Sequence, residues 1–180
     1  MSLEVIVLLL AATVQSGTPI LYATLGEIFT EKSGVLNLGV EGAMIIGALA
    51  GFLVSRASGS PYLGFLAAGV AGSGAAAIHG MVCLWFMGNQ VVSGLALTIL
   101  GTGLANYFGT GFVGMSAPGF SPMPIPVLAD IPVVGAIFFR QDLLVYISYF
   151  IPLLMFLFLY RTRFGLGLRL SHIASMELGD

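Results

Sequence analysis

Gly34-Val35-Leu36-Asn37-Leu38-Gly39-Val40-Glu41-Gly42 places an amide and a carboxylate directly ahead of an apolar run, Ala43 to Val54. On insertion scales a carboxylate at the bilayer centre costs about 2.5–3.5 kcal/mol, so such a residue rarely faces lipid. We therefore expect Asn37 and Glu41 to face another helix or a water-filled path, as residues on a transport route do.

The composition places the rest of the chain in a membrane. Of its 180 residues, 58% are hydrophobic and 8% are charged, and the mean hydropathy is +1.04. Soluble domains carry about 25% charged residues, so a water-soluble fold would have too little polar surface. The net charge of −2 argues against a nucleic-acid partner. Because Met1-Ser2-Leu3-Glu4 lacks a basic start, we interpret the first apolar run as retained rather than as a signal peptide.

Five apolar segments are long enough to cross a bilayer, which takes about 20 residues as a helix. They are Leu3–Ile28, interrupted by Gln15-Ser16-Gly17-Thr18-Pro19, then Val35–Val54, Tyr62–Met87, Val91–Val113 and Leu143–Tyr160. Strand-like alternation does not persist in any of them. The sequence predicts an all-α, polytopic transmembrane helix bundle with about five spans.

Lys and Arg in short loops set the orientation of membrane proteins. Arg161, Arg163 and Arg169 follow the fifth segment and mark that end as cytoplasmic; a re-entrant second segment would reverse the assignment for everything before it. The loop 114–142 then lies outside. Its five prolines disfavour a long helix, yet its middle, residues 127–139, is apolar. We expect a cap or a half-inserted piece packed on the bundle, with a disordered loop as the alternative.

Small residues recur every fourth position in the third segment: Gly64, Ala68, Gly72, Ala76 and Gly80. Such a ridge lets another helix backbone approach closely. We expect packing within one subunit, and the alternative is a dimer interface. In the fourth segment Thr98 and Asn106 lie on one small, polar face. Threonine hydroxyls can bond back to their own helix, whereas the Asn106 amide needs a neighbouring helix, a water or a ligand.

The chain shows no residues for catalysis, metal binding or phosphate binding. His79 has no second ligand at metal spacing and is expected to be a packed, hydrogen-bonded residue. No Gly-rich phosphate loop and no nucleophile elbow are present in the sequence. We predict no catalytic residue and no cofactor bound by this chain. Uphill transport would need an ion gradient or a partner subunit.

Three motifs together resemble a known family. The stretch 34–42 is similar to the signature of ABC importer permeases for simple sugars and nucleosides, which are relatives of the branched-chain amino acid permeases. Asn89-Gln90-Val91-Val92-Ser93-Gly94-Leu95-Ala96-Leu97 resembles a second hallmark, and Thr162-Arg163-Phe164-Gly165-Leu166 a third. The resemblance covers about residues 16–169. The turn at Asn89-Gln90 would be unremarkable on its own.

The resemblance implies a permease subunit in a bacterial or archaeal plasma membrane. It implies a second permease subunit, a separate ABC ATPase that binds ATP-Mg, and an extracytoplasmic solute-binding protein or lipoprotein as partners. It also implies that some polar residues line or brace the translocation path: Asn37, Glu41, Asn89, Gln90 and Ser93. To these the polar face of the fourth segment adds Thr98 and Asn106 as candidates.

The chain departs from the family after Arg169. Relatives continue into an Ala-rich coupling helix, whereas here the residues 170–180 form an atypical tail without that pattern. We expect a transmembrane permease domain over residues 1–169 that is incomplete, in a truncated or frame-shifted product.

Three alternatives stay open from the sequence. The first is a branched-chain amino acid ABC permease, because these families share a scaffold. The second is a stand-alone secondary transporter or channel, in which Glu41 carries a coupling proton. The third is a structural membrane subunit without a path of its own, which the small-residue ridge alone would suit.

Overall fold

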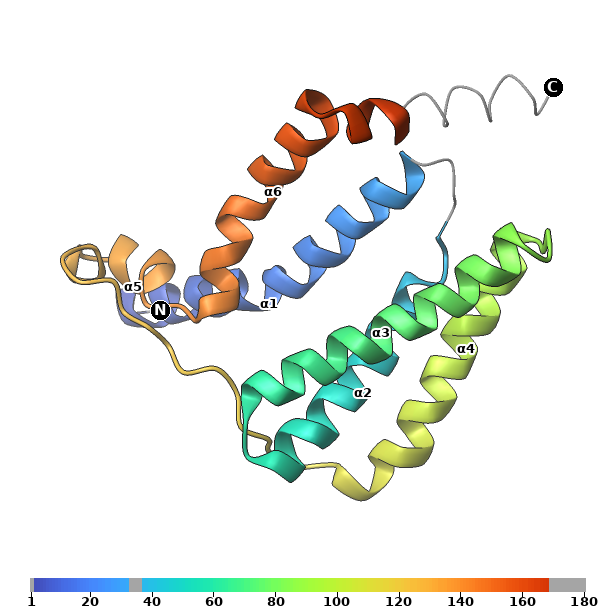
Figure 1. Cartoon of the computed structure of the whole chain (residues 1–180). Helices are drawn as coiled ribbons and strands as arrows, with labels where there is room; N and C mark the ends of the chain where they lie inside the picture. The colour runs from blue at the N-terminus through green and yellow to red at the C-terminus, as the bar shows by residue number, and fades with distance from the viewer. Residues whose placement is uncertain (1, 33–36, 169–180) are drawn as a thin grey trace. The chain divides into compact units, whose positions relative to one another are not determined.

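The computed structural model describes residues 2–32 and 37–168. Over these residues the chain is helical and contains no strand (Figure 1). Five of the described helices are long and apolar enough to cross a membrane: α1 Leu3–Glu31, α2 Val40–Ser58, α3 Pro61–Leu84, α4 Gln90–Gly109 with the short η1 Thr110–Phe112, and α6 Leu143–Arg161. The predicted all-α bundle with five spans is confirmed. The atypical tail, 170–180, lies outside the described residues.

The chain divides into two compact units. One is Gly34–Gly119, and the other combines Met1–Ser33 with Phe120–Asp180. An α-helix satisfies its backbone hydrogen bonds internally, as a segment that spans a lipid bilayer must.

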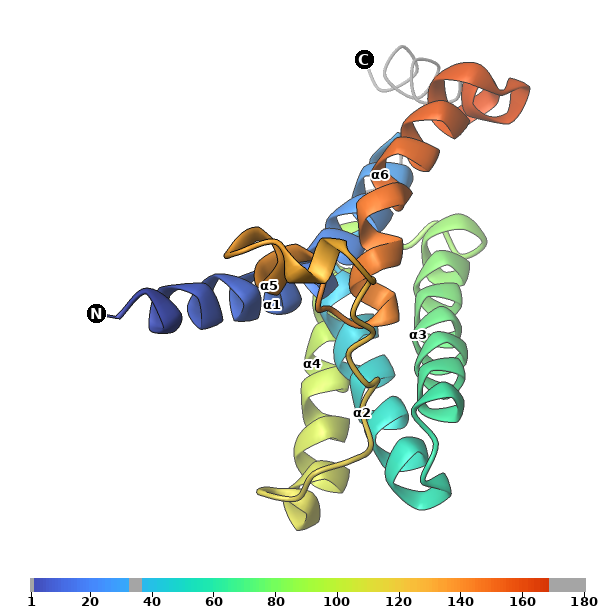
Figure 2. The same ribbon diagram turned by 90° about the vertical axis from the view of Figure 1, so that its left-hand side faces the viewer.

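In the unit Gly34–Gly119, α2 packs against both α3 and α4 (Figure 2). The connection from α2 to α3 is tight. Gly59 ends α2 in a left-handed conformation with φ 71°, and Pro61 occupies the first turn of α3. Glycine just past a helix end and proline at a helix start are the residues these positions favour. The two helices therefore run as a hairpin side by side.

Small residues set the distance between α2 and α3. A Cβ on Gly64 would lie 2.7 Å from the carbonyl oxygen of Gly51, and one on Gly47 would lie 3.0 Å from that of Ala68. A Cβ on Gly72 would lie 3.4 Å from the carbonyl oxygen of Ala43. The backbones thus approach as closely as small-residue ridges permit.

In the described residues, only part of the small-residue ridge predicted on α3 packs against another helix. Its first three members, Gly64, Ala68 and Gly72, lie against α2. Ala76 is exposed, and no atom lies within 4 Å of a Cβ placed on Gly80. The contact ends where α3 passes beyond the start of α2.

In the second unit, α1 continues through the stretch 15–19 that the sequence analysis took as an interruption. Pro19 lies inside the helix, and α1 bends part way along its length (Figure 2). Proline removes one helical hydrogen bond and bends the helix without ending it when the flanking turns are stable. The Thr18 hydroxyl donates to Val14 O at 3.0 Å. The predicted first span is therefore one continuous helix, because the apolar turns on both sides of the polar stretch keep it intact.

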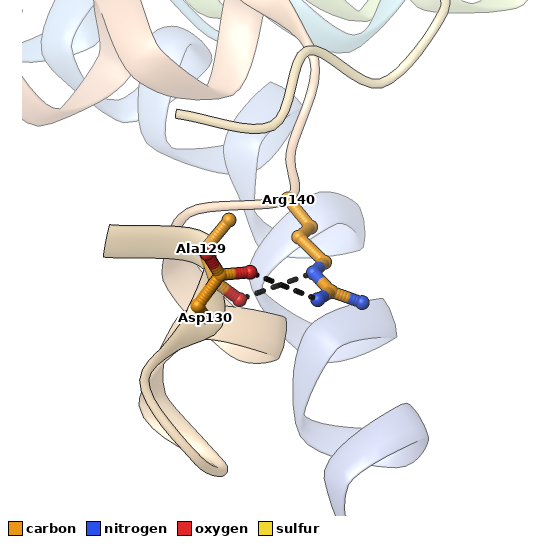
Figure 3. Close-up of polar contacts among 3 residues, drawn as sticks. All are labelled: Ala129, Asp130 and Arg140. Carbon is orange, nitrogen blue, oxygen red and sulfur yellow. Dashed lines mark hydrogen bonds and ion pairs between the residues drawn. The ribbon is translucent and has the colours of Figure 1, made fainter. Parts of the chain in front are cut away.

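The loop before α6 is folded and packs on α1. It contains η2 Leu128–Asp130 and α5 Val134–Phe138, and α5 contacts α1. Figure 3 shows how Arg140 holds η2: its Nε donates to Ala129 O at 3.2 Å, and its guanidinium lies 4.0 Å from the Asp130 carboxylate. Gln141, only 4% exposed, donates from Nε2 to Ala11 O at 3.2 Å. The expectation that residues 127–139 pack on the helices is confirmed, because α5 contacts α1.

Two valines in this cap adopt positive φ. Val127 has φ 70° and Val133 has φ 66°, and each follows a proline whose carbonyl accepts a hydrogen bond two residues on. This is the geometry of the classic γ-turn, which is strained for a β-branched residue. The same Ile-Pro-Val sequence thus makes the same turn twice, a repeat that the sequence analysis missed.

Substituting Gly64 tests the close approach of α2 and α3. In Gly64→Ala the added methyl meets Gly51 O and the Ser55 Cβ, which lies 2.6 Å away. We expect a loss of about 1–3 kcal/mol in the free energy of unfolding, the usual cost of overpacking. Gly69→Ala is the matched control on the same helix, because nothing lies within 4 Å of its added Cβ.

Thermal unfolding of the purified protein in detergent measures both variants. The control should be as stable as the parent or gain about 0.5–1 kcal/mol, since alanine favours a helix over glycine. Equal melting temperatures for the two variants would contradict the packing of α2 on α3.

Candidate functional site

The described part of the first motif forms the start of α2. Residues 37–39 make a turn closed by a hydrogen bond from Val40 N to Asn37 O at 3.4 Å, and the helix begins at Val40. Asn37 is half-buried. Glu41 is exposed in the first turn, where the helix dipole favours a carboxylate. The residues 34–36 lie outside the described part of the chain.

The second motif packs on the first through glycines. A Cβ on Gly94 would lie 2.8 Å from Gly39 N, and a Cβ on Gly101 would lie 2.7 Å from Gly42 O. An added Cβ on Gly42 would lie 2.7 Å from Thr98 N. We call these four glycines, Gly39, Gly42, Gly94 and Gly101, the glycine joint. It brings the backbone at the start of α2 into direct contact with the backbone of α4.

A polar contact accompanies the glycine joint. The Thr98 hydroxyl lies 3.4 Å from Leu38 O and 3.3 Å from Gly94 O, so it can donate to the turn before α2 or to its own helix. Motifs separated by about fifty residues in the sequence therefore meet at one place. Among the predicted path residues, Thr98 contributes its side chain to this contact.

The polar residues at the start of α4 include a helix cap and a contact to α3. The Asn89 side chain is the N-cap and accepts from Val91 N at 3.0 Å and Val92 N at 3.1 Å. Asparagine is among the residues preferred at this position. Ser93 Oγ lies 2.9 Å from Nδ1 of His79 on α3. Gln90 is the first residue of α4 and is half-buried.

The polar face of α4 is divided between backbone bonds and exposed groups. The Thr102 hydroxyl donates to Thr98 O at 2.9 Å, which is the bond back to its own helix that the sequence analysis left open. The Asn106 side chain is exposed. Its backbone carbonyl accepts a hydrogen bond from the Thr110 hydroxyl. The Asn106 amide therefore lies on a surface of this unit.

The third motif turns the chain after α6. Thr162 Oγ1 accepts from Gly165 N at 3.1 Å and donates to Phe158 O at 2.6 Å, and residues 163–168 form a further helical turn. An added Cβ on Gly165 would lie 2.6 Å from the Leu159 carbonyl carbon. Threonine and glycine at these two positions thus permit a sharp reversal directly after a span.

The sequence analysis missed two residues, at the C-terminal end of α2, that bind the segment after η1. Ser55, 6% exposed, donates to Pro118 O at 2.6 Å. Arg56 donates to Ser116 O at 2.9 Å and lies over the Phe112 ring. These bonds join positions about sixty residues apart, and no local pattern in the sequence marks them. They fasten the segment after η1 to the end of α2.

The described residues do not assemble a metal centre. No group of three His, Cys, Asp or Glu side chains lies close enough there to hold a metal ion. The glycine joint is thus a packing contact with uncharged polar groups and the Glu41 carboxylate near it in the sequence.

Comparison with known proteins agrees with the motifs. A family model described as "Branched-chain amino acid transport system / permease component" matches residues 9–173. A putative glucose ABC transporter permease protein of Haloferax volcanii is 45% identical over 162 residues, which cover 88% of this chain and 49% of the relative. The comparison with solved structures found no match.

Two further relatives are named for nucleosides. A guanosine ABC transporter permease protein of Bacillus subtilis is 34% identical over 92% of this chain and 56% of its own length. A nucleoside ABC transporter permease protein of Lactococcus lactis is 29% identical over 84% of this chain and 51% of its own length. This chain therefore spans about half the length of the curated relatives it matches. With the family model covering nearly its whole length, the chain belongs to the permease component family of the branched-chain amino acid transport systems.

Proposed function

We propose that this chain forms part of the translocation path of an ATP-driven importer for a nucleoside or a simple sugar. The observation that carries the proposal is the glycine joint, where the first two motifs of the family meet in the unit Gly34–Gly119. The glucose, guanosine and nucleoside permeases among its relatives support the substrate class. A branched-chain amino acid remains the competing solute.

The proposal includes partners that the chain itself does not supply. Its sequence has no phosphate-binding loop, so ATP hydrolysis falls to a separate ABC ATPase. A second permease subunit completes the path, and an extracytoplasmic binding protein or lipoprotein delivers the solute. The assembly lies in the plasma membrane, with the third motif on the cytoplasmic side.

The proposed path is lined by polar residues around the glycine joint. Glu41 and Asn106 are exposed in their unit. The Thr98 hydroxyl lies 3.4 Å from Leu38 O, and a Cβ on Gly39 would lie 3.5 Å from Asn37 Oδ1. Asn89 and Gln90 begin α4 beside this surface. A carboxylate and amides can accept and donate hydrogen bonds to the hydroxyls of a sugar or ribose.

Uptake by the full importer tests the proposed function. We expect vesicles that contain the permease, its ATPase and its binding protein to take up labelled nucleoside or sugar only with ATP. Inactivation of the ATPase should abolish uptake while the permease stays in the membrane. Solute flux through this chain alone, driven by a proton or sodium gradient and lost in Glu41→Gln, would contradict the proposal and favour a secondary transporter.

Substitution of the proposed path residues tests their role separately. Glu41→Gln removes the charge, and Asn106→Ala removes the amide. A hydrogen bond to a charged group contributes about 1.5–3 kcal/mol, so uptake through Glu41→Gln should fall about tenfold or more. Ser73→Ala is the control, because Ser73 is exposed on α3 and its hydroxyl bonds only to its own helix. Normal transport by both path variants would favour a structural role for this chain.

A further inference from the structure

A buried polar cluster joins α3 to α4 outside the glycine joint. His79 is 5% exposed and Cys83, one turn further along α3, is 6% exposed. Nδ1 of His79 lies 2.9 Å from Ser93 Oγ on α4. The Cys83 sulfur lies 3.7 Å from Nε2 and 3.8 Å from Nδ1 of the same ring. None of these contacts was expected from the sequence beyond a packed histidine.

The Ser93 hydroxyl differs from most of the serine and threonine hydroxyls in the described helices, which bond back to their own helix. Serine and threonine inside a membrane helix can bond to the carbonyl four residues earlier. Ser73 does so to Gly69 O at 2.6 Å, and Thr102 to Thr98 O at 2.9 Å. The bond that the structure gives Ser93 instead crosses to another helix. A buried imidazole in a membrane helix also requires a partner, because an unpaired buried polar group is costly.

The connection between α3 and α4 is short and strained, so a hydrogen bond between the two helices near it affects the position of the second motif. Only residues 85–89 separate α3 from α4, and Met87 has φ 52°. Asn89 and Gln90 lie one turn before Ser93 at the start of α4. A hydrogen bond from Ser93 to α3 therefore fixes the direction in which α4 begins, and with it the positions of Asn89 and Gln90.

We propose that His79 is a positioning residue that holds Ser93, and so the start of α4, against α3. Ser93 then acts in the second motif as an interhelical anchor and does not contact the solute. The inference rests on the proposed function for its effect on transport, but the anchor itself is a property of the folded chain. Two ligands without a third do not make this cluster a metal site.

Cys83 serves as a built-in reporter for the anchor, because the sequence of 180 residues contains one cysteine. Its thiol is buried beside His79, so a maleimide should label it slowly in the purified protein. Labelling is followed by mass spectrometry of the peptide that contains Cys83. Ser93→Ala removes the hydroxyl with little change in volume, and Ser93→Thr keeps it. Ser73→Ala is the matched control on α3.

We expect Cys83 in Ser93→Ala to react at least fivefold faster than in the parent. Ser93→Thr and Ser73→Ala should stay within twofold of the parent. An unchanged labelling rate in Ser93→Ala would overturn the proposal, because the Ser93–His79 hydrogen bond would then not be needed to keep α4 packed over Cys83. This readout needs no transport activity, so it remains decisive even if the proposed function fails.

Uptake kinetics in the assembled importer separate an anchor from a solute contact. Ser93→Ala and His79→Leu should lower the maximal rate to a similar extent, and the double variant should be no worse than either one. The KM should stay within twofold, and His79→Asn, which keeps a hydrogen-bonding group near the position of Nδ1, should restore most of the rate. A severalfold rise in KM for Ser93→Ala alone would overturn the proposal and make Ser93 a solute contact.

Discussion

The direct contact between helix backbones is the constraint on which the unit Gly34–Gly119 depends. α2 touches α3 through Gly47, Gly51 and Gly64, and it touches α4 through the glycine joint. In lipid there is little hydrophobic force to drive helices together, so close packing and hydrogen bonds between helices must do so. A side chain larger than hydrogen at these crossings would separate the helices and weaken both. The central position of α2 follows from its having a small-residue face toward each neighbour.

The motif residues fall into two groups: those that hold helices together and those that remain exposed. The glycines, together with Asn89 and Ser93, build and fasten the start of α4, through backbone contacts, an N-cap and a bond to His79. Glu41 and Asn106 remain exposed in the unit. A motif that identifies a transporter family thus encodes helix geometry as much as contact with a solute. The proposed path depends on the second group and is shaped by the first.

Much of the fold could be predicted because its signals are local. Apolar length alone identified the five spans, and small residues at a spacing of four identified the face of α3 that meets α2. The start of α2 at Val40 was missed, since one polar residue, Asn37, was not enough to mark the turn before the apolar run. The fastening of Ser55 to Pro118 and of His79 to Ser93 could not be read from the sequence, because each depends on how distant segments pack.

The meeting of the two motifs is tested most directly by joining them covalently. With Cys83 replaced by alanine, Leu38→Cys and Thr98→Cys place thiols where Leu38 O and the Thr98 hydroxyl are 3.4 Å apart. A short bifunctional thiol reagent should link this pair in native membranes, as shown by a cross-linked peptide. Leu38→Cys with Phe108→Cys is the control, because ten residues along a helix amount to about 15 Å. Linkage of the first pair alone is the predicted result, whereas linkage of neither pair, or of both equally, would contradict the glycine joint.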